Sequence, residues 1–313
     1  MHLDLYVAMA GLIVGFVVGL TGMGGGALMT PILVLLFNVK PLAAVSSDLV
    51  AAVVMKPVGG GVHLRRGTVN LTLVKWLCVG SVPSAFIGVL ILKSLGKGTE
   101  LQDHVQLALG IALLVASCGI VAKAIVQHGR AVDTDVHGLT VRPLPTIAIG
   151  VVGGLVVGMT SVGSGSLMIV LLLVLYPSVS APRLVGTDLV QAIPLVASAA
   201  LGHLIFGDFE LSLTTSLLIG SLPGVYFGAR ASAKAPDHVI RPALVIVLVL
   251  SGLKLLQASN QVLGVALAIG VMVFVVLQMR RRGRSAVDHV VGGHREVVEQ
   301  PALDGDVEVE LDH

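Results

Sequence analysis

Nine apolar runs follow one another along the chain, and short segments with charged and turn-forming residues separate them. Seven of the runs have the length of a single helix across a hydrocarbon core of about 30 Å. The first and fifth runs, of 32 and 33 residues, are too long for one straight crossing. The runs occupy residues 5–36, 43–63, 71–92, 105–126, 144–176, 184–206, 211–231, 239–256 and 261–279.

Each of the two long runs is interrupted by a cluster of glycine and hydroxyl residues. The first break, TGMGGG, spans residues 21–26, and the second break, TSVGSG, spans residues 160–165. Backbone polar groups must be satisfied in hydrocarbon, so a helix is interrupted there only where protein or a water-filled cavity surrounds it. Paired breaks at matching positions of two halves are typical of the binding sites of membrane transporters.

The match between the two halves extends beyond the breaks, at a constant offset of 140 residues. The segment SDLV at 47–50 corresponds to TDLV at 187–190, and GSVP at 80–83 corresponds to GSLP at 220–223. Chance agreement between apolar residues does not hold one offset over such a length. The sequence therefore predicts a duplicated architecture.

The composition places the duplicated chain in a membrane. Of its 313 residues, 55% are hydrophobic and 12% are charged, and the mean hydropathy is +0.96. Soluble domains are about 45–50% apolar and about 25% charged, so a water-soluble globule is excluded. We expect an all-α polytopic membrane protein with duplicated, inverted repeats and a broken or re-entrant helix at the start of each half.

The positive charges predict how the chain is oriented. Three arginines at 280–282 directly follow the last run, which places the C-terminus in the cytoplasm of a cell-membrane protein. If each long run enters the membrane and returns on the same side, most other Lys and Arg residues lie inside and each half has three spans. The alternative is that the long runs cross the membrane once. The expected segments are a first repeat at 1–126, a cytoplasmic linker at 127–142, a second repeat at 143–256, a final transmembrane helix at 257–282 and a disordered acidic tail at 283–313.

The breaks are the candidate substrate site. A helix that resumes after a break points its free amides and the positive end of its dipole at the gap, and such a terminus binds anions. The second break also offers hydroxyl donors, whereas the first is mostly bare backbone. The alternative interpretation of the breaks is that their glycines merely permit helices to cross closely. The candidate residues are Thr21, Gly22, Gly24, Gly25 and Gly26 in the first half, and Thr160, Ser161, Gly163, Ser164 and Gly165 in the second.

Lys56 is a single cation deep in the second run, directly before Pro57, and the second half has Val196 at its equivalent. Such a residue suits contact with an anion, although a salt bridge to an acidic residue would also explain it. Gln191, in the equivalent run of the second half, supplies a neutral donor. We expect both residues to contribute to the substrate site.

Two repeated pairs of titratable residues have either a coupling or a structural role. Asp48 and Asp188 would couple transport to protons or cations, or cap the first turn of a helix, and the second interpretation is favoured by their place near the start of a run. His63 and His203 would relay protons, or interact with the dipole at the end of their helices, which is again the favoured interpretation.

The sequence gives little support to other classes of function. It contains no metal-ligand spacing and no Walker-type loop, so we expect no metal, no cofactor, no nucleic-acid partner and no enzymatic activity. The expected partners are a small anionic solute, with proton or cation coupling, and membrane lipid. An anion channel is the main alternative to a carrier, and a serine hydrolase with Ser164 as nucleophile and His203 as base is a weaker one.

These motifs resemble the TauE/SafE family of sulfite and organosulfonate exporters. The resemblance rests on the Gly-rich first break, the Ser47–Asp48–Leu49 and Thr187–Asp188–Leu189 segments, the His–Gly pairs and the repeated Gly-Ser-x-Pro segments, and it covers about residues 5–279. It implies a duplicated permease of the plasma membrane that exports anions such as sulfite or sulfoacetate. The serines of the second break depart from the more Gly-rich pattern of the first.

Overall fold

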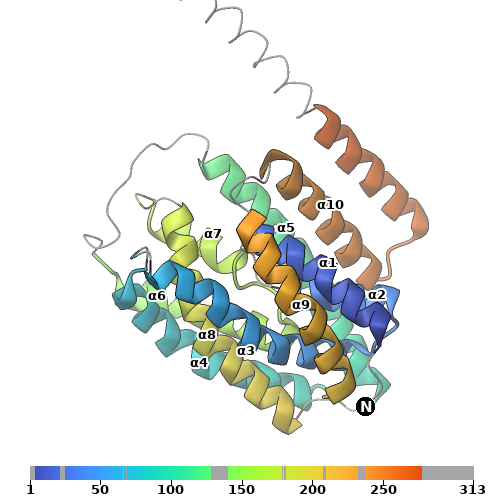
Figure 1. Ribbon diagram of the computed structural model, residues 1–313, viewed down its shortest axis with the longest axis horizontal. Coiled ribbons are helices and arrows are strands. Elements are labelled where there is room, and N and C mark those ends of the chain that lie inside the picture. Colours follow the sequence, from blue (N-terminus) through green and yellow to red (C-terminus); the bar gives the residue numbers. More distant parts are fainter. Residues whose placement is uncertain are drawn as a thin grey trace, which may run out of the picture. The chain divides into compact units, whose positions relative to one another are not determined.

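The computed structural model describes residues 4–21, 25–65, 67, 69–96, 98–127, 140–177, 179, 181–206, 209–231 and 237–276, and within them every regular element is a helix (Figure 1). A compact unit of residues 1–267 contains ten of the helices, and the helix Asn260–Val276 ends in a second unit that begins at residue 268. The ten helices are α1 (Leu5–Thr21), α2 (Gly26–Leu36), α3 (Pro41–Arg65), α4 (Leu71–Ser94), α5 (Thr99–Gln127), α6 (Pro143–Thr160), α7 (Leu167–Leu175), α8 (Ala181–Phe206), α9 (Leu211–Ala231) and α10 (Asp237–Leu255).

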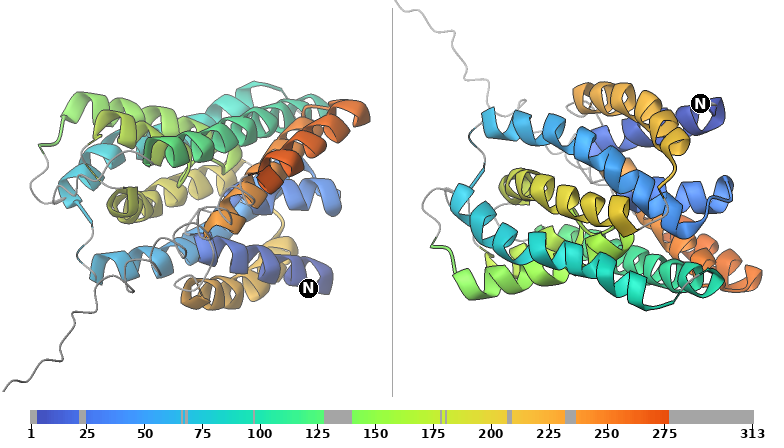
Figure 2. Two further views of the ribbon diagram at one scale, coloured as in Figure 1. Left: turned by 90° about the horizontal axis from the view of Figure 1, so that it is seen from above. Right: turned by 90° about the horizontal axis from the view of Figure 1, so that it is seen from below.

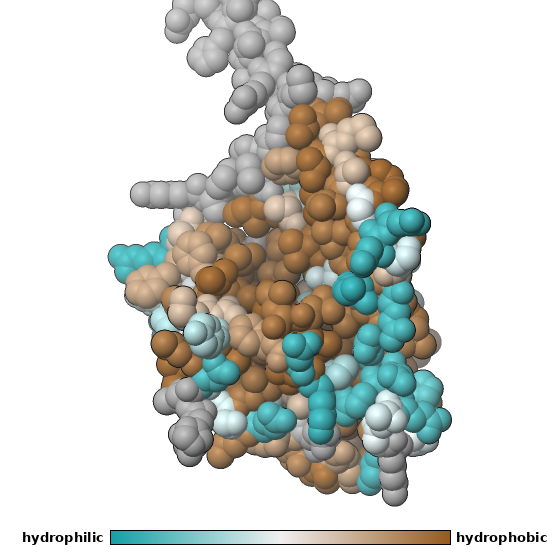
Figure 3. Space-filling model, turned by 90° about the vertical axis from the view of Figure 1, so that its right-hand side faces the viewer, coloured by the Kyte–Doolittle hydropathy of each residue, from teal (hydrophilic) through white to brown (hydrophobic). Residues whose placement is uncertain are grey.

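Six of the helices in the described part of the chain are long and apolar enough to cross a membrane: α3, α4, α5, α6, α8 and α9. Shorter apolar helical stretches are Leu5–Leu20, Gly26–Leu36, Pro242–Leu255 and Asn260–Val276. Apolar side chains also dominate the face shown in Figure 3. The all-α polytopic membrane fold predicted from the apolar runs is confirmed. The acidic tail and most of the linker lie outside the described residues.

Both long runs are divided into two helices, as predicted. The first run forms α1 and α2, and the second break separates α6 from α7. Ser161, Gly163 and Gly165 have φ angles of 59°, 120° and 92°. These left-handed conformations end α6, and the two glycines adopt them without the steric cost of a Cβ atom.

The helices α6 and α7 form a hairpin. The Tyr176 hydroxyl, directly after α7, accepts a hydrogen bond from the backbone N–H of Arg142 at 2.9 Å and shares another with Thr146 Oγ1 at 2.6 Å. Both partners lie at the beginning of α6, so α7 returns to the end of the hairpin from which α6 starts. This is the course that a re-entrant fifth run requires.

The first helix of each half packs against a helix of the other half. Helix α1 packs on α9, and its repeat equivalent α6 packs on α4, the equivalent of α9 (Figure 1 and Figure 2). Glycines let the backbones touch: a Cβ atom on Gly220 would lie 1.8 Å from the carbonyl oxygen of Ala8, and one on Gly150 would lie 2.5 Å from that of Leu77. Close approach over small residues is how membrane helices associate without a hydrophobic driving force.

This packing predicts a large difference between two Gly-to-Ala substitutions. Gly220→Ala overpacks the α1–α9 contact and should lower the free energy of unfolding by about 1–3 kcal/mol. Gly61→Ala, where no atom lies within 4 Å of the added Cβ, should leave it unchanged or raise it by up to about 1 kcal/mol. Unfolding of the purified variants in mixed detergent measures both. Equal effects of the two substitutions would contradict the packing.

The equivalent helices α3 and α8 run antiparallel beside each other. Ser46, near the start of α3, bonds with His203, near the end of α8, at 2.9 Å. At the other end, the backbone N–H of Asn70, beyond the end of α3, donates to Thr187 Oγ1, near the start of α8, at 3.1 Å. The chain thus places the middle of each helix against the middle of its repeat equivalent.

Candidate substrate site at the helix breaks

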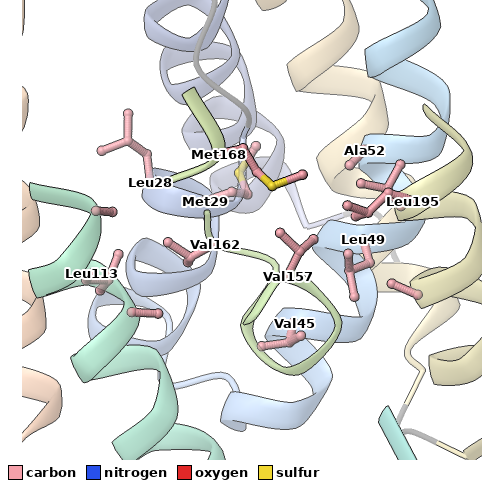
Figure 4. Packing of buried hydrophobic residues seen from close by; sticks show 14 of the residues in the cluster. Leu28, Met29, Val45, Leu49, Ala52, Leu113, Val157, Val162, Met168 and Leu195 are labelled. Carbon is pink, nitrogen blue, oxygen red and sulfur yellow. The ribbon is translucent and has the colours of Figure 1, made fainter. Parts of the chain in front are cut away.

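The two breaks, about 140 residues apart in sequence, touch each other. A Cβ atom on Gly26, the first residue of α2, would lie 1.9 Å from the carbonyl oxygen of Ser161. Only a residue without a side chain permits this contact. Around it, Figure 4 shows Met29 of α2, Val162 and Met168 packed together, with Leu49 of α3 nearby, and all four are in the buried core.

Asp48 joins the two breaks through its side chain. Ser161 Oγ donates to Asp48 Oδ2 at 2.5 Å, and Thr30 Oγ1, on α2, donates to the same oxygen at 3.2 Å. The carboxylate is 1% exposed. In the first break, a Cβ atom added to Gly25 would lie 3.5 Å from Asp48 Oδ1.

The favoured interpretation of Asp48 and Asp188 as N-caps is wrong. Helix α3 begins at Pro41 and α8 at Ala181, so both carboxylates lie two turns inside their helices. Proline is favoured in the first turn of a helix, where its missing N–H has no cost, and it starts α3 before the apolar run begins. Both side chains are 1% exposed.

Lys56 reaches the second break from α3. Its Nζ donates to Ser164 Oγ at 2.6 Å, and the side chain is 8% exposed. The carboxylates of Asp188 and Asp48 interact with it electrostatically. Among the described residues, Ser164 is its one hydrogen-bond partner, so two of the three N–H groups of the ammonium remain for a ligand.

The remaining residues of the second break are mostly structural. Thr160 Oγ1 donates to the carbonyl oxygen of Val156 at 2.6 Å and accepts from the N–H of Val162 at 3.1 Å, which ties the chain down as it leaves α6. Ser166 precedes α7, and its side chain makes no capping bond. Of the predicted first-break residues, Thr21 ends α1, Gly25 and Gly26 are at the site, and Gly22 and Gly24 lie outside the described residues.

Gln191 is fully buried on α8, and its Nε2 donates to Ser81 Oγ of α4 at 2.6 Å. Its Oε1 has no hydrogen-bond partner among the described residues. The neighbouring Val190 and Ile193 lie against Gly60, one turn of α3 beyond Lys56. Sequence reasoning missed Ser81 as a site residue, although the repeated Gly-Ser-x-Pro segment marked its position.

His203 caps a helix other than its own. It is fully buried in the last turn of α8, and its Nε2 lies 2.8 Å from the carbonyl oxygen of Gly158 in the last turn of α6. A carbonyl accepts only, so Nε2 carries the hydrogen, and Nδ1 bonds with Ser46 Oγ. The expected interaction with a helix C-terminus is present, but at α6. His63 lies half-buried in the last turn of α3.

Replacing His203 by leucine should destabilise the protein. The substitution removes both ring hydrogen bonds and leaves a buried carbonyl without its partner, which costs about 2–4 kcal/mol. His104→Leu is the matched control, because the His104 ring bonds only its own helix at an exposed position, and we expect a change below about 0.5 kcal/mol. Detergent unfolding measures both. A His203→Leu variant as stable as His104→Leu would contradict the capping role.

The serine hydrolase hypothesis required Ser164 and His203 to meet. Instead, Ser164 bonds with Lys56, and the His203 ring bonds with Gly158 and Ser46. The predicted nucleophile and base are therefore not paired.

Six helices of spanning length and two helix breaks that meet around buried charges define a multi-pass membrane transporter. The chain belongs to the sulfite exporter TauE/SafE family, whose model matches residues 7–255. This match confirms the resemblance found in the motifs.

Two relatives from Bacillus subtilis (strain 168) agree with this assignment. The probable membrane transporter protein YjnA is 36% identical over 252 residues, which are 80% of this chain and 98% of that protein. The probable membrane transporter protein YdhB is 23% identical over 244 residues, which are 78% of this chain and 96% of that protein. No solved structure matches the chain.

Proposed function

We propose that the protein is a secondary transporter that exports small anions such as sulfite or organosulfonates by alternating access at the paired breaks. The observation that carries the proposal is the Lys56 ammonium, which is buried beside the second break and has two N–H groups without a partner among the described residues. A bound oxyanion would supply acceptors for both.

Two positive features of the second break support an anion at this place. The first is the buried ammonium of Lys56, although the carboxylates of Asp188 and Asp48 already interact with it. The N-terminus of α7, which follows the break at Leu167, adds the positive end of a helix dipole. Both features act at the same point, because Ser164 holds the Lys56 side chain there.

Hydroxyl donors would complete the coordination. Ser164 contacts Lys56 directly, and Ser166 adds a hydroxyl at the residue that precedes α7. Sulfite and sulfonates carry three oxygens around one sulfur, so they can accept hydrogen bonds from several directions at once. The first half has Gly25 and Ala27 at the equivalents of Ser164 and Ser166, so we infer one anion site rather than two.

The arrangement of the halves supports alternating access. The antiparallel course of α3 and α8 and the exchange of α1 and α6 between the halves are what inverted repeats would produce. The mobile elements would be helix α2 and the α6–α7 hairpin, which meet at Gly26 and Ser161. We place the transporter in the plasma membrane with its C-terminus in the cytoplasm.

Flux measurements in proteoliposomes test the proposal. Labelled sulfite, sulfoacetate, sulfate and a monocarboxylate are offered to liposomes containing the purified protein, with and without the same anion inside. A carrier gives saturable uptake that internal anion accelerates. Uptake that neither saturates nor responds to internal anion would indicate a channel, and no flux of any tested anion would overturn the proposed substrate class.

The contact between Lys56 and Ser164 favours one second candidate. A lysine amine 2.6 Å from a serine hydroxyl is also the arrangement of a serine–lysine hydrolase. Ser164→Ala separates the two functions. A transporter should retain uptake within about tenfold, because the hydroxyl is one of several neutral donors, whereas a hydrolase would lose its activity.

A further inference from the structure

The Asp48 carboxylate holds the α6–α7 hairpin and helix α2 together at a single oxygen. Its Oδ2 accepts from Ser161, which ends α6, and from Thr30, one turn into α2. The three side chains are at most 6% exposed. In this conformation, the contact between the breaks therefore depends on the carboxylate being an acceptor for both hydroxyls.

The ionisable groups around Asp48 leave the centre short of positive charge. Among the side chains that the structure describes on the helices packed around it, the buried ionisable ones are Lys56 on α3 and Asp188 and His203 on α8. Helices α2 and α6 contain no ionisable residue, and those described on α5 and α9 lie in exposed or half-exposed positions. Two carboxylates thus face one ammonium, and a bound anion would add further negative charge.

We propose that Asp48 binds and releases a proton that crosses the membrane together with the anion. The inference rests on the proposed anion transport and assigns its coupling ion. A buried carboxylate that accepts from neutral hydroxyls keeps a high energetic cost as an anion, and intramembrane carboxylates of this kind serve as proton relays. Each bound proton offsets one charge of the anion.

The hydrogen bonds explain how the proton would control the conformation. The Asp48 carboxylate is an acceptor only, and Ser161 and Thr30 both donate to Oδ2. When that oxygen takes a proton, it becomes a donor, and at least one of the two hydroxyls must turn or move away. Protonation at Oδ2 therefore loosens the contact between the α6–α7 hairpin and α2, and deprotonation restores it.

Asp48→Asn, which mimics the protonated acid, is the first test, with Asp103→Asn at an exposed position of α5 as the matched control. In wild-type liposomes we expect anion uptake to carry protons, read by an internal pH dye, and to be driven by a pH gradient. Asp48→Asn should lose at least tenfold of the gradient-driven uptake, and the uptake that remains should no longer carry protons. Asp103→Asn should behave as wild type.

A second variant keeps the proposal testable if Asp48→Asn does not fold. Ser161→Ala removes one donor to the carboxylate, which favours the protonated form, and should move the pH profile of uptake to higher pH. Gradient-driven uptake that survives in Asp48→Asn, or an unchanged profile in Ser161→Ala, would overturn the coupling role. Saturable wild-type flux without proton movement would also overturn it while leaving the anion carrier in place; absence of saturable flux would reject the carrier itself.

Discussion

Replacing Lys56 by glutamine should lower the kcat/KM of anion uptake by about 100-fold or more. The substitution removes the buried positive charge at the second break and the hydrogen bonds that its ammonium would donate to the anion. Hydrogen bonds that involve a charged group contribute about 1.5–3 kcal/mol each, and each 1.4 kcal/mol changes the rate tenfold. Initial rates of labelled sulfite uptake over a range of concentrations measure the effect.

Lys75→Gln is the matched control for this prediction. Lys75 is an exposed lysine on α4, and its ammonium lies 5.8 Å from the centre of the Trp76 ring. Its removal should leave kcat/KM within about twofold, since a solvated charge contributes little. If Lys56→Gln and Lys75→Gln transport sulfite equally well, Lys56 does not bind the anion.

Replacing Gly26 by alanine should separate the two breaks. The added Cβ would lie 1.9 Å from the Ser161 carbonyl oxygen and 2.6 Å from its carbon, so the backbone itself must move. Overpacking of this kind costs about 1–3 kcal/mol, and we expect transport to fall at least tenfold because the backbones of the two breaks must move apart. Detergent unfolding and uptake are measured on the same preparation.

The neighbouring Gly25 provides the control for Gly26. Its added Cβ would be 3.5 Å from Asp48 Oδ1, an ordinary contact, and its φ and ψ of −55° and −35° suit alanine. Gly25→Ala should therefore keep the stability and most of the uptake. Equal losses in the two variants would show that the breaks tolerate no side chain anywhere, and that the Gly26–Ser161 contact has no special role.

The helices and both breaks could be predicted from the sequence because they depend on local patterns. Apolar runs of about 20 residues specify membrane helices, and the glycine clusters specify where two of the runs stop. The constant offset of 140 residues predicts the duplication. Family membership followed from motifs at the same positions, and the family match over residues 7–255 confirms it.

The partners of the site residues could not be predicted, since they come from distant parts of the chain. Ser161 bonds with Asp48 across 113 residues, and Gln191 bonds with Ser81 across 110. Thr30 is hidden in an apolar run, and nothing local marks it as a partner of Asp48. His203 was expected to act at its own helix end, but tertiary packing brings it to the unpaired Gly158 carbonyl of α6.

The asymmetry between the halves distinguishes the site from the scaffold. The repeated residues, such as Asp48 and Asp188, occur in both halves, whereas Lys56 and Ser164 have Val196 and Gly25 as their equivalents. Duplication thus explains the fold, and the residues that break the repeat converge on one contact at 2.6 Å. That contact is where we infer that the anion binds.

Calorimetric titration of the detergent-purified protein with sulfite tests the anion site most directly, because it separates binding from transport. We predict saturable binding of one anion per chain, an affinity at least about 30-fold weaker in Lys56→Gln, and an unchanged affinity in Lys75→Gln. Binding to Lys56→Gln with wild-type affinity, or binding of sulfite to none of the three proteins, would contradict an anion site at Lys56 and the second break.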